Sequence, residues 1–204
     1  AATTTGRGYF LNAGDTLRQG LEAAVGYENS KWSAYASYAY IDATFESSIV
    51  LPAPNTPDAP LCPGAPVGGA TCNFVTPGDN MPGIPQHRFK AGFNYWLTPQ
   101  WQFGADLVAL SGQRFFGDEA NTQKLLPGYT RVDLHTSYDV NEHIQLYGLV
   151  KNLFDQHYGL YGTFFDTEES ADAATAAGYQ PFEDPRSITP AAPITAYGGL
   201  RMKF

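Results

Sequence analysis

Apolar and polar side chains alternate with a period of two along Ile194–Phe204. One face of this segment carries Ile194, Ala196, Gly198, Leu200, Met202 and Phe204, and the other carries Thr195, Tyr197, Gly199, Arg201 and Lys203. A period of two predicts a β-strand with one apolar and one polar face. A strand that has lipid on one side and water on the other needs this pattern.

The same alternation recurs in earlier parts of the chain. Further strands are predicted at Tyr9–Tyr27, Trp32–Thr44, Arg88–Leu97, Trp101–Gln113, Tyr129–Val140 and His143–Lys151. The aromatic share of 14% and the 21 glycines and 15 prolines favour an all-β chain with many turns. The sequence contains no run of about 18 apolar residues, so it predicts no transmembrane helix. Strands of a membrane barrel need only about 9–11 residues each. We therefore expect a transmembrane antiparallel β-barrel with about seven strands in this chain.

The connections between these strands alternate between short and longer ones. The longer connections are Phe45–Ile84, Arg114–Pro127 and Asp155–Pro193. Antiparallel hairpins place all short turns at one end of a sheet, as membrane barrels do with periplasmic turns and long extracellular loops. The proline density of the first loop predicts neither helix nor sheet there. In the third loop, Glu168–Ala177 is predicted to be helical.

Charged side chains fall on the polar face of the predicted strands. The lumen-facing candidates are Arg88, Lys90, Arg131, Asp133, His135, Lys151, Arg201 and Lys203. A small soluble barrel would fill its interior with apolar side chains, so polar groups on this face favour a water-filled lumen. We expect these cations to pair with carboxylates of the lumen or with a plug domain inside it. The alternative is that some of them steer an anionic ligand such as a ferric chelate.

Three polar residues on one strand could resemble part of a hydrolase triad. Asp133, His135 and Ser137 share a face, but successive residues on one face of a strand lie about 7 Å apart. A hydrogen-bonded lumen cluster with Arg131 explains them better, and we predict no catalytic residue and no cofactor. The acidic segment Asp155–Ser187 could bind Ca²⁺ or a cationic ligand, although solvated loop charge is the preferred explanation.

The two cysteines, Cys62 and Cys72, lie in one stretch that is rich in proline and glycine. We predict a disulfide between them, which implies an oxidising compartment. A metal-binding pair is the alternative, but it lacks a histidine or further cysteine nearby. The formal net charge of −8 argues against a nucleic-acid partner.

Short motifs occur along the chain in an order that resembles one protein family. They are Asn12-Ala13-Gly14-Asp15 with Gly20-Leu21-Glu22, then Tyr38–Ala43, then Pro85–Arg88, then Asn152-Leu153-Phe154-Asp155 with Tyr158, and finally the terminal Phe204. Together they resemble the C-terminal part of a TonB-dependent outer-membrane receptor. We interpret Gly20, Glu22 and the Asn152–Tyr158 motif as structural. The resemblance implies that Phe204 is a recognition signal for the barrel-assembly machinery.

The resemblance implies that residues 1–204 form the C-terminal segment of a barrel of about 22 strands. The plug domain and the earlier strands would be absent from this segment, whose start at AATTTGRG we interpret as that of a fragment or a processed product. The implied function is import of a scarce ligand across the bacterial outer membrane by TonB-coupled active transport, and a ferric siderophore is the ligand we expect. The implied partners are outer-membrane lipid and, through the plug, the TonB-type energy-transducing protein. A passive porin or structural barrel is the alternative.

Overall fold

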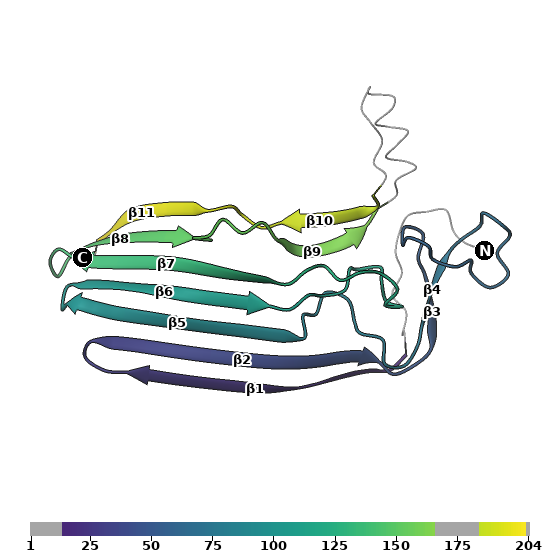
Figure 1. Cartoon of the computed structure of the whole chain (residues 1–204), viewed down its shortest axis with the longest axis horizontal. Helices are drawn as coiled ribbons and strands as arrows, with labels where there is room; N and C mark the ends of the chain where they lie inside the picture. Colours follow the sequence, from purple (N-terminus) through teal and green to yellow (C-terminus); the bar gives the residue numbers. More distant parts are fainter. Residues whose placement is uncertain (1–13, 166–183, 203–204) are drawn as a thin grey trace, which may run out of the picture.

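A computed structural model describes residues 14–165 and 184–202 of the chain, and these residues form strands and loops (Figure 1). The strands are β1 (Thr16–Glu28), β2 (Trp32–Phe45), β3 (Ile49–Pro52), β4 (Cys72–Val75), β5 (His87–Thr98), β6 (Trp101–Leu110), β7 (Tyr129–Asp139), β8 (Ile144–Lys151), β9 (Gly159–Phe164), β10 (Arg186–Pro190) and β11 (Thr195–Met202). In the two described ranges, no helix has the length and apolar character that crossing a membrane requires.

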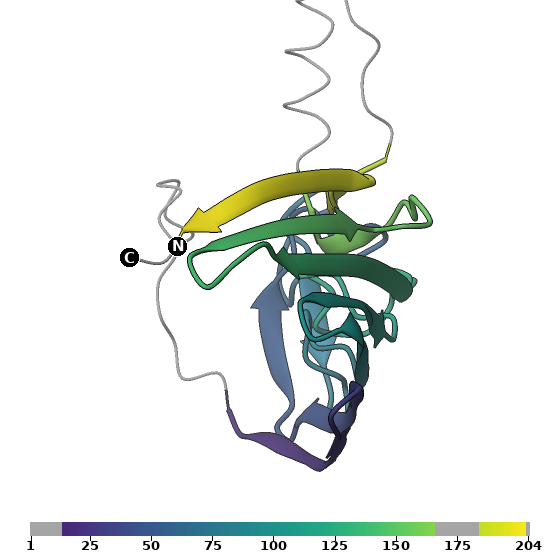
Figure 2. The ribbon, with the colours of Figure 1, turned by 90° about the vertical axis from the view of Figure 1, so that its left-hand side faces the viewer.

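Seven of the strands form one antiparallel sheet in the order β1-β2-β5-β6-β7-β8-β11. Each strand pairs with the next one along this order. The short turns lie together at one end of the sheet and the long loops at the other (Figure 1). Viewed along the strands, the sheet is curved, and the β3–β4 hairpin lies on its concave side (Figure 2). The prediction of an all-β, antiparallel fold is confirmed.

The first long loop corrects a prediction. Proline density led us to expect no sheet there, but β3 and β4 pair from Ile49↔Val75 to Pro52↔Cys72. The physical reason is the position of the prolines, not their number. Pro52 ends β3, and the later prolines of this loop lie either between the two strands or after β4, where no ladder hydrogen bond of the pair is lost.

The third long loop also contains a strand pair that the sequence did not predict. β9 and β10 run antiparallel from Arg186↔Phe164 to Pro190↔Gly159, with an irregularity between Thr189 and Pro190. The predicted helix Glu168–Ala177, the first part of the predicted strand Tyr9–Tyr27, and Lys203 and Phe204 all lie outside the described residues.

The buried apolar side chains gather at the loop end of the molecule. They are Ala43, Phe45, Ala53, Cys72, Val75, Phe115, Leu126 and Phe164. Along the seven-stranded sheet, by contrast, large apolar side chains are exposed, including Leu21, Val25, Phe93, Leu134 and Leu200. An exposed apolar face on a sheet of this size indicates a surface that something else covers.

Candidate functional site

Successive rows of paired residues across the sheet carry different kinds of side chain. One row across the sheet reads Ala34, Phe93, Ala105, Leu134, Val150 and Ala196. The next row reads Ser33, Asn94, Gly104, His135, Leu149 and Tyr197. Because neighbouring rows point to opposite faces, the sheet has one apolar face and one that carries most of the polar groups.

A hydrogen-bonded network spans four strands of the polar face, with Asp106 on β6 near its centre. The Tyr35 hydroxyl donates to Oδ1 of Asp106 at 3.1 Å, and His135 Nδ1 lies 3.3 Å from Oδ2. His135 Nε2 lies 2.8 Å from Oδ1 of Asn94, which also accepts a hydrogen bond from Gln102 Nε2 at 2.6 Å. The network ties β2, β5, β6 and β7 together through side chains as well as backbone.

Two glycines make room for this network. A Cβ atom at Gly92 would collide with the Tyr35 ring and with Oδ1 of Asp106. A Cβ atom at Gly104 would collide with the Phe93 carbonyl oxygen and with the imidazole of His135. The absence of side chains at these two positions therefore lets Tyr35 and His135 lie across the neighbouring strands.

The predicted group of Arg131, Asp133, His135 and Ser137 divides in two. Arg131 pairs with Asp133 at 2.9 Å, and Asp133 also accepts the backbone N–H of Asn152 at 2.9 Å. His135 instead contacts Asp106, and Ser137 Oγ lies 3.5 Å from Gln102 Oε1. Asp133, His135 and Ser137 thus have separate partners and do not form the relay that a hydrolase triad requires.

The remaining lumen-facing candidates differ in their partners. Arg201 donates to Gln145 Oε1 at 3.1 Å, and Lys151 Nζ lies 5.9 Å from the centre of the Tyr197 ring. Arg88 and Lys90 line a hollow that also contains Glu22. Among the described residues, neither of these two cations has a carboxylate within 4.0 Å, and their pairing stays a prediction.

Sequence reasoning missed several members of the network, namely Tyr35, Asn94, Gln102 and Asp106. Alternation along β5 and β6 places the last three on the polar face. Their mutual contacts depend on the register between strands, which alternation within one strand does not specify.

The Asn152–Asp155 motif joins the end of β8 to the segment that leads into β11. Asn152 is buried, has a φ of 53°, and donates from Nδ2 to the carbonyls of Gln156 and Ala192 at 3.0 and 3.2 Å. Asp155 has a φ of 47° and accepts the N–H of Ile194 at 2.8 Å. Asparagine and aspartate tolerate this left-handed conformation better than most residues, which explains the residue types.

The long loops pack against one another to form what we call the loop cluster, residues 46–86, 111–128 and 152–165 with 184–194. The Gly117 carbonyl accepts hydrogen bonds from Thr56 Oγ1 and Asn73 Nδ2, both at 2.6 Å. Gln123 Nε2 donates to the Pro57 carbonyl at 2.8 Å. Side-chain amides and hydroxyls from the first loop and the second thus satisfy each other's backbone groups.

The third loop closes over an apolar centre in the same cluster. The rings of Phe115 and Phe164 stack with centroids 5.3 Å apart, and Leu126 completes the buried group. The backbone N–H of Phe116 donates to the Gly162 carbonyl at 2.9 Å. The loop cluster is therefore packed like the core of a small soluble domain.

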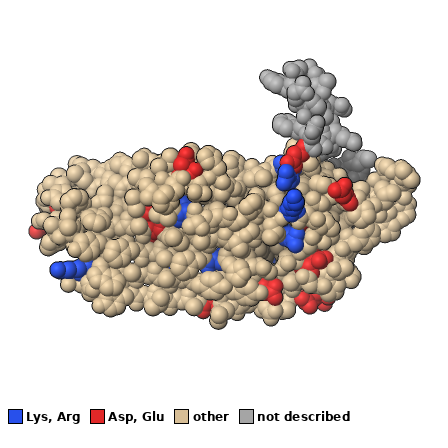
Figure 3. Space-filling view, viewed as in Figure 1, with Lys and Arg blue, Asp and Glu red and all other residues tan. Residues whose placement is uncertain are grey.

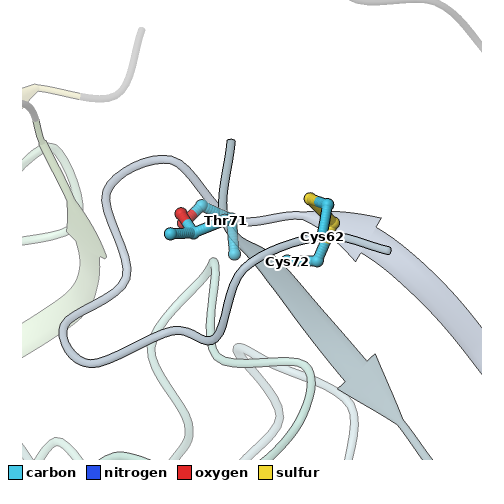
Figure 4. Close-up of a disulfide and its surroundings, with 4 residues drawn as sticks. Cys62, Thr71 and Cys72 are labelled. Carbon is cyan, nitrogen blue, oxygen red and sulfur yellow. A yellow bond between two sulfur atoms is a disulfide. The ribbon is translucent and has the colours of Figure 1, made fainter. Parts of the chain in front are cut away.

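The cysteines predicted to pair form a disulfide in the first loop (Figure 4). The Cα atoms of Cys62 and Cys72 are 5.0 Å apart. Thr71, next to the bridge, donates from Oγ1 to the Ala53 carbonyl at 2.7 Å. Cys72 begins β4 and Asn73 follows it, so the bridge lies one residue from a side chain that reaches the second loop.

A buried carboxylate organises the second loop. The Asp118 side chain is fully buried, and its Oδ1 accepts the backbone N–H groups of Thr122 and Gln123 at 2.7 and 3.1 Å. Arg114 NH1 lies 3.5 Å from Oδ2. Burial raises the pKa of Asp118, while these hydrogen bonds and Arg114 act in the opposite direction.

A pocket of about 340 Å³ opens on the loop cluster, lined in part by Asp58, Lys124, Asp184 and Arg186. Asp184 and Arg186 form an ion pair at 2.6 Å, and the Arg186 guanidinium lowers the pKa of Asp184 to about 2. On the face seen in Figure 3, charged side chains are sparse over the sheet and more frequent at the loop end. Within the described ranges, no group of three or more His, Cys, Asp or Glu side chains could hold a metal ion.

Comparison with known proteins gives a consistent family. Residues 1–153 match the family model described as TonB dependent receptor-like, beta-barrel. The chain is 28% identical over 171 residues to a probable TonB-dependent siderophore receptor, PiuA, of Acinetobacter baumannii, covering 82% of this chain and 21% of that protein. It is 37% identical over 81 residues to the vitamin B12 transporter BtuB of Photobacterium profundum, covering 40% of this chain and 13% of the transporter.

Solved structures share the fold. The siderophore receptor PiuA from Acinetobacter baumannii superposes with a TM-score of 0.64 and 22% identity, over 93% of this chain and 22% of that one. The ferric yersiniabactin uptake receptor FyuA from Yersinia pestis gives 0.62 and 17%, over 95% and 24%. The chain therefore spans between about a fifth and a quarter of these proteins, and the likeness places its sheet in a barrel wall.

Proposed function

The chain belongs to the TonB dependent receptor-like β-barrel family, and from this premise we propose that it forms part of a receptor that imports a ferric siderophore across the bacterial outer membrane by TonB-coupled active transport. Residues 1–204 would be the C-terminal wall of the barrel and would supply three of its extracellular loops. The observation that carries the proposal is the family match over residues 1–153, combined with a sheet that has one exposed apolar face and one hydrogen-bonded polar face.

The apolar and polar faces of the sheet support its placement in the membrane. Leu134 and Leu200 are exposed on the apolar face, where outer-membrane lipid would cover them. The network around Asp106 would then face the lumen, together with the candidates Arg88, Lys90, Arg131, Asp133, His135, Lys151 and Arg201. Backbone groups at the β1 and β11 edges need partner strands in lipid, so further strands of the receptor would complete the barrel.

The loop cluster would form part of the extracellular mouth, where an incoming ligand first meets the receptor. A siderophore is favoured as the ligand class because relatives in sequence and in fold are described as siderophore receptors. The coupling step would belong to the plug and the energy-transducing protein, and the barrel-assembly machinery would recognise the terminal Phe204. We propose no catalytic role and no bound cofactor for these residues.

Uptake of a radiolabelled ferric siderophore by cells that carry the complete receptor tests this proposal. Uptake should stop when the TonB-type protein is deleted or the proton gradient is collapsed, because the ligand is moved by coupled transport. Diffusion of a small sugar through an unrelated porin serves as the control and should continue. Ferric siderophore uptake that persists without the energy supply would instead identify a passive pore.

A further inference from the structure

The second long loop, residues 111–128, makes buried hydrogen bonds with the first. Its Gly117 carbonyl accepts from Thr56 Oγ1 and from Asn73 Nδ2, both at 2.6 Å, and both of these side chains are buried. Asn73 Nδ2 also donates to Glu119 Oε2 at 2.9 Å. A buried donor whose acceptor moves away would lose its hydrogen bond without gaining one to water, so these contacts hold the two loops together.

Asn121 joins the same two loops at a second place. Its Oδ1 accepts the backbone N–H of Asn80 at 2.9 Å, and its Nδ2 donates to the Asn80 carbonyl at 2.9 Å. Asn121 has a φ of 56°, a conformation that asparagine tolerates better than most residues. Arg114 NH1 donates to the carbonyls of Asn121 and Gln123 at 3.3 and 2.7 Å, which holds the turn that presents Asn121.

The second loop also makes hydrogen bonds with the described part of the third. The Phe116 N–H donates to the Gly162 carbonyl at 2.9 Å, and the Phe116 carbonyl accepts from Thr163 Oγ1 at 3.3 Å. Phe116 and Thr163 thereby form a parallel bridge. Gln113 Nε2 donates to the Leu160 carbonyl at 2.7 Å. The second loop is therefore bound to both of its neighbours.

We propose that the second loop couples the first and third loops into one rigid body, so that a displacement of any one loop displaces all three. The contacts to the two neighbours fall on adjacent residues, Phe116 for the third loop and Gly117 for the first. Only two soft dihedral angles, those of Gly117, separate the two carbonyls that accept these bonds. The Gly117 N–H in turn donates to Glu119 Oε1 at 3.2 Å, which restrains that residue.

The coupling depends on contacts between residues of this chain, so it does not depend on how the other strands and the plug of a complete receptor are arranged. Its role at the extracellular mouth rests on the proposed function. There, the three loops would form one stretch of the rim in place of three separate lids. A ligand that contacts any one of these loops would act on all of them.

Distances between pairs of nitroxide labels in the complete receptor, measured by pulsed electron paramagnetic resonance, test the coupling. Labels at Val67 in the first loop and Leu160 in the third report on the two outer loops, because both positions are exposed. Attachment through non-natural residues leaves the Cys62–Cys72 bridge intact. A rigid body should give a narrow distance distribution in the parent receptor. A second pair, at Val50 and Val67, shows whether the first loop itself stays folded.

The double variant Thr56→Val/Asn73→Ala removes both hydrogen bonds to the Gly117 carbonyl. The distribution between the first and third loops should then broaden, while that within the first loop stays narrow. Thr71→Val is the matched control, because Thr71 Oγ1 donates to the Ala53 carbonyl at 2.7 Å within the first loop. Equal broadening in the control and in the double variant would contradict the coupling, since the effect would not come from the contact between loops.

Gly162→Ala tests the coupling from the third loop. A Cβ atom at Gly162 would collide with the Phe115 ring, so this variant should also broaden the distribution between the first and third loops. Gly198→Ala on β11 is the control, because its Cβ atom would meet only the Tyr147 carbonyl oxygen at 3.8 Å. A broad distribution in the parent receptor, or a narrow one that persists in both the double variant and Gly162→Ala, would overturn the inference.

Failure of this inference can be told apart from failure of the proposed function. A receptor that takes up its ligand with energy coupling but shows a broad distribution disproves only the rigid body. A narrow distribution in a receptor without energy-dependent uptake disproves only the transport.

Discussion

The seven-stranded sheet and the loop cluster bury their apolar groups in opposite ways. The largest fully buried side chains of the described residues are Phe115, Leu126, Val75, Asn73, Asn152 and Asp118, and all of them lie in the loop cluster. On the sheet, Leu21 remains 64% exposed and Leu134 37% exposed. One region has an interior of its own, and the other presents its apolar side chains outward.

This difference indicates that the apolar side chains of the two regions are suited to different surroundings. The loop cluster gains stability by removing Phe115, Leu126 and Phe164 from water, as a soluble domain does. The sheet keeps its polar groups on one face and presents an apolar face outward, as the wall of a barrel in a bilayer does. Substitutions should therefore affect one region without the other, and the expected effects can be ranked.

The largest effect is expected from Phe115→Ala in the loop cluster. Removing a ring that is 2% exposed should cost about 3–5 kcal/mol of local stability, because the cavity left beside Phe164 cannot collapse fully. Amide hydrogen exchange of the three loops in the complete receptor measures this loss, which should leave the protection of β5–β8 unchanged. Phe116→Ala is the matched control, since Phe116 is 47% exposed. Similar losses for both variants would disprove a separate loop core.

The next effect should come from Leu134→Arg on the sheet. A cation on the lipid face near the bilayer midplane costs about 2–4 kcal/mol, and this cost should appear as impaired folding into lipid vesicles in a urea titration. Ser137→Arg on the polar face should fold with a smaller penalty, because its side chain reaches water. Equal penalties for the two substitutions would overturn the assignment of the faces.

Removal of the Cys62–Cys72 bridge should have a smaller effect that is confined to the first loop. The bridge closes a loop with a sequence separation of 10, so Cys62→Ser/Cys72→Ser should lower local stability by about 2–3 kcal/mol. Faster amide exchange in β3 and β4 measures the effect, and Ser137→Ala on the sheet is the control variant, in which exchange of β3 and β4 should be unchanged. Peptide mass spectrometry without reductant should show the linked peptides in the parent receptor, and two free thiols would contradict the bridge.

The smallest effect concerns the exposed ion pair of Asp184 and Arg186. The pKa of Asp184 is lowered to about 2 in the folded loop, so the pair contributes stability at a pH above the ordinary aspartate pKa of about 3.9. This contribution is lost as the pH falls through about 2. As the pH is lowered from about 3.9 to about 2, amide exchange of β10 should therefore accelerate in the parent receptor. The acceleration should be smaller in Asp184→Asn, which has no carboxylate to protonate. An identical pH dependence in both would show that the pair does not stabilise β10.

The strands of the sheet were predictable because each one contains its own alternation. Along β7 and β8, for example, the residues that alternate in the sequence point to alternating faces in the structure. The β3–β4 hairpin was not predictable in the same way. Its four-residue strands are too short to establish a period, and the surrounding prolines concealed them.

The partners within the candidate site were harder to predict than its position. Sequence alternation places His135 on the polar face, but it does not show that Asp106 on the neighbouring strand, and not Asp133 on its own strand, is its partner. That choice depends on register and on the absence of a side chain at Gly104. The hydrogen bonds from Thr56 and Asn73 to the Gly117 carbonyl join residues that are 44 or more positions apart in the sequence. A local sequence pattern cannot reveal such contacts.

The glycines beneath the network would also affect the lumen of the proposed barrel. Because Gly92 and Gly104 carry no side chain, the Tyr35 ring and the His135 imidazole lie directly over the backbone of the neighbouring strands. An alanine at Gly92 would push the Tyr35 ring away from the sheet, and one at Gly104 would strain the Phe93 carbonyl as well as the His135 imidazole. In the proposed barrel, the two missing methyl groups would thus help to set the width of the lumen.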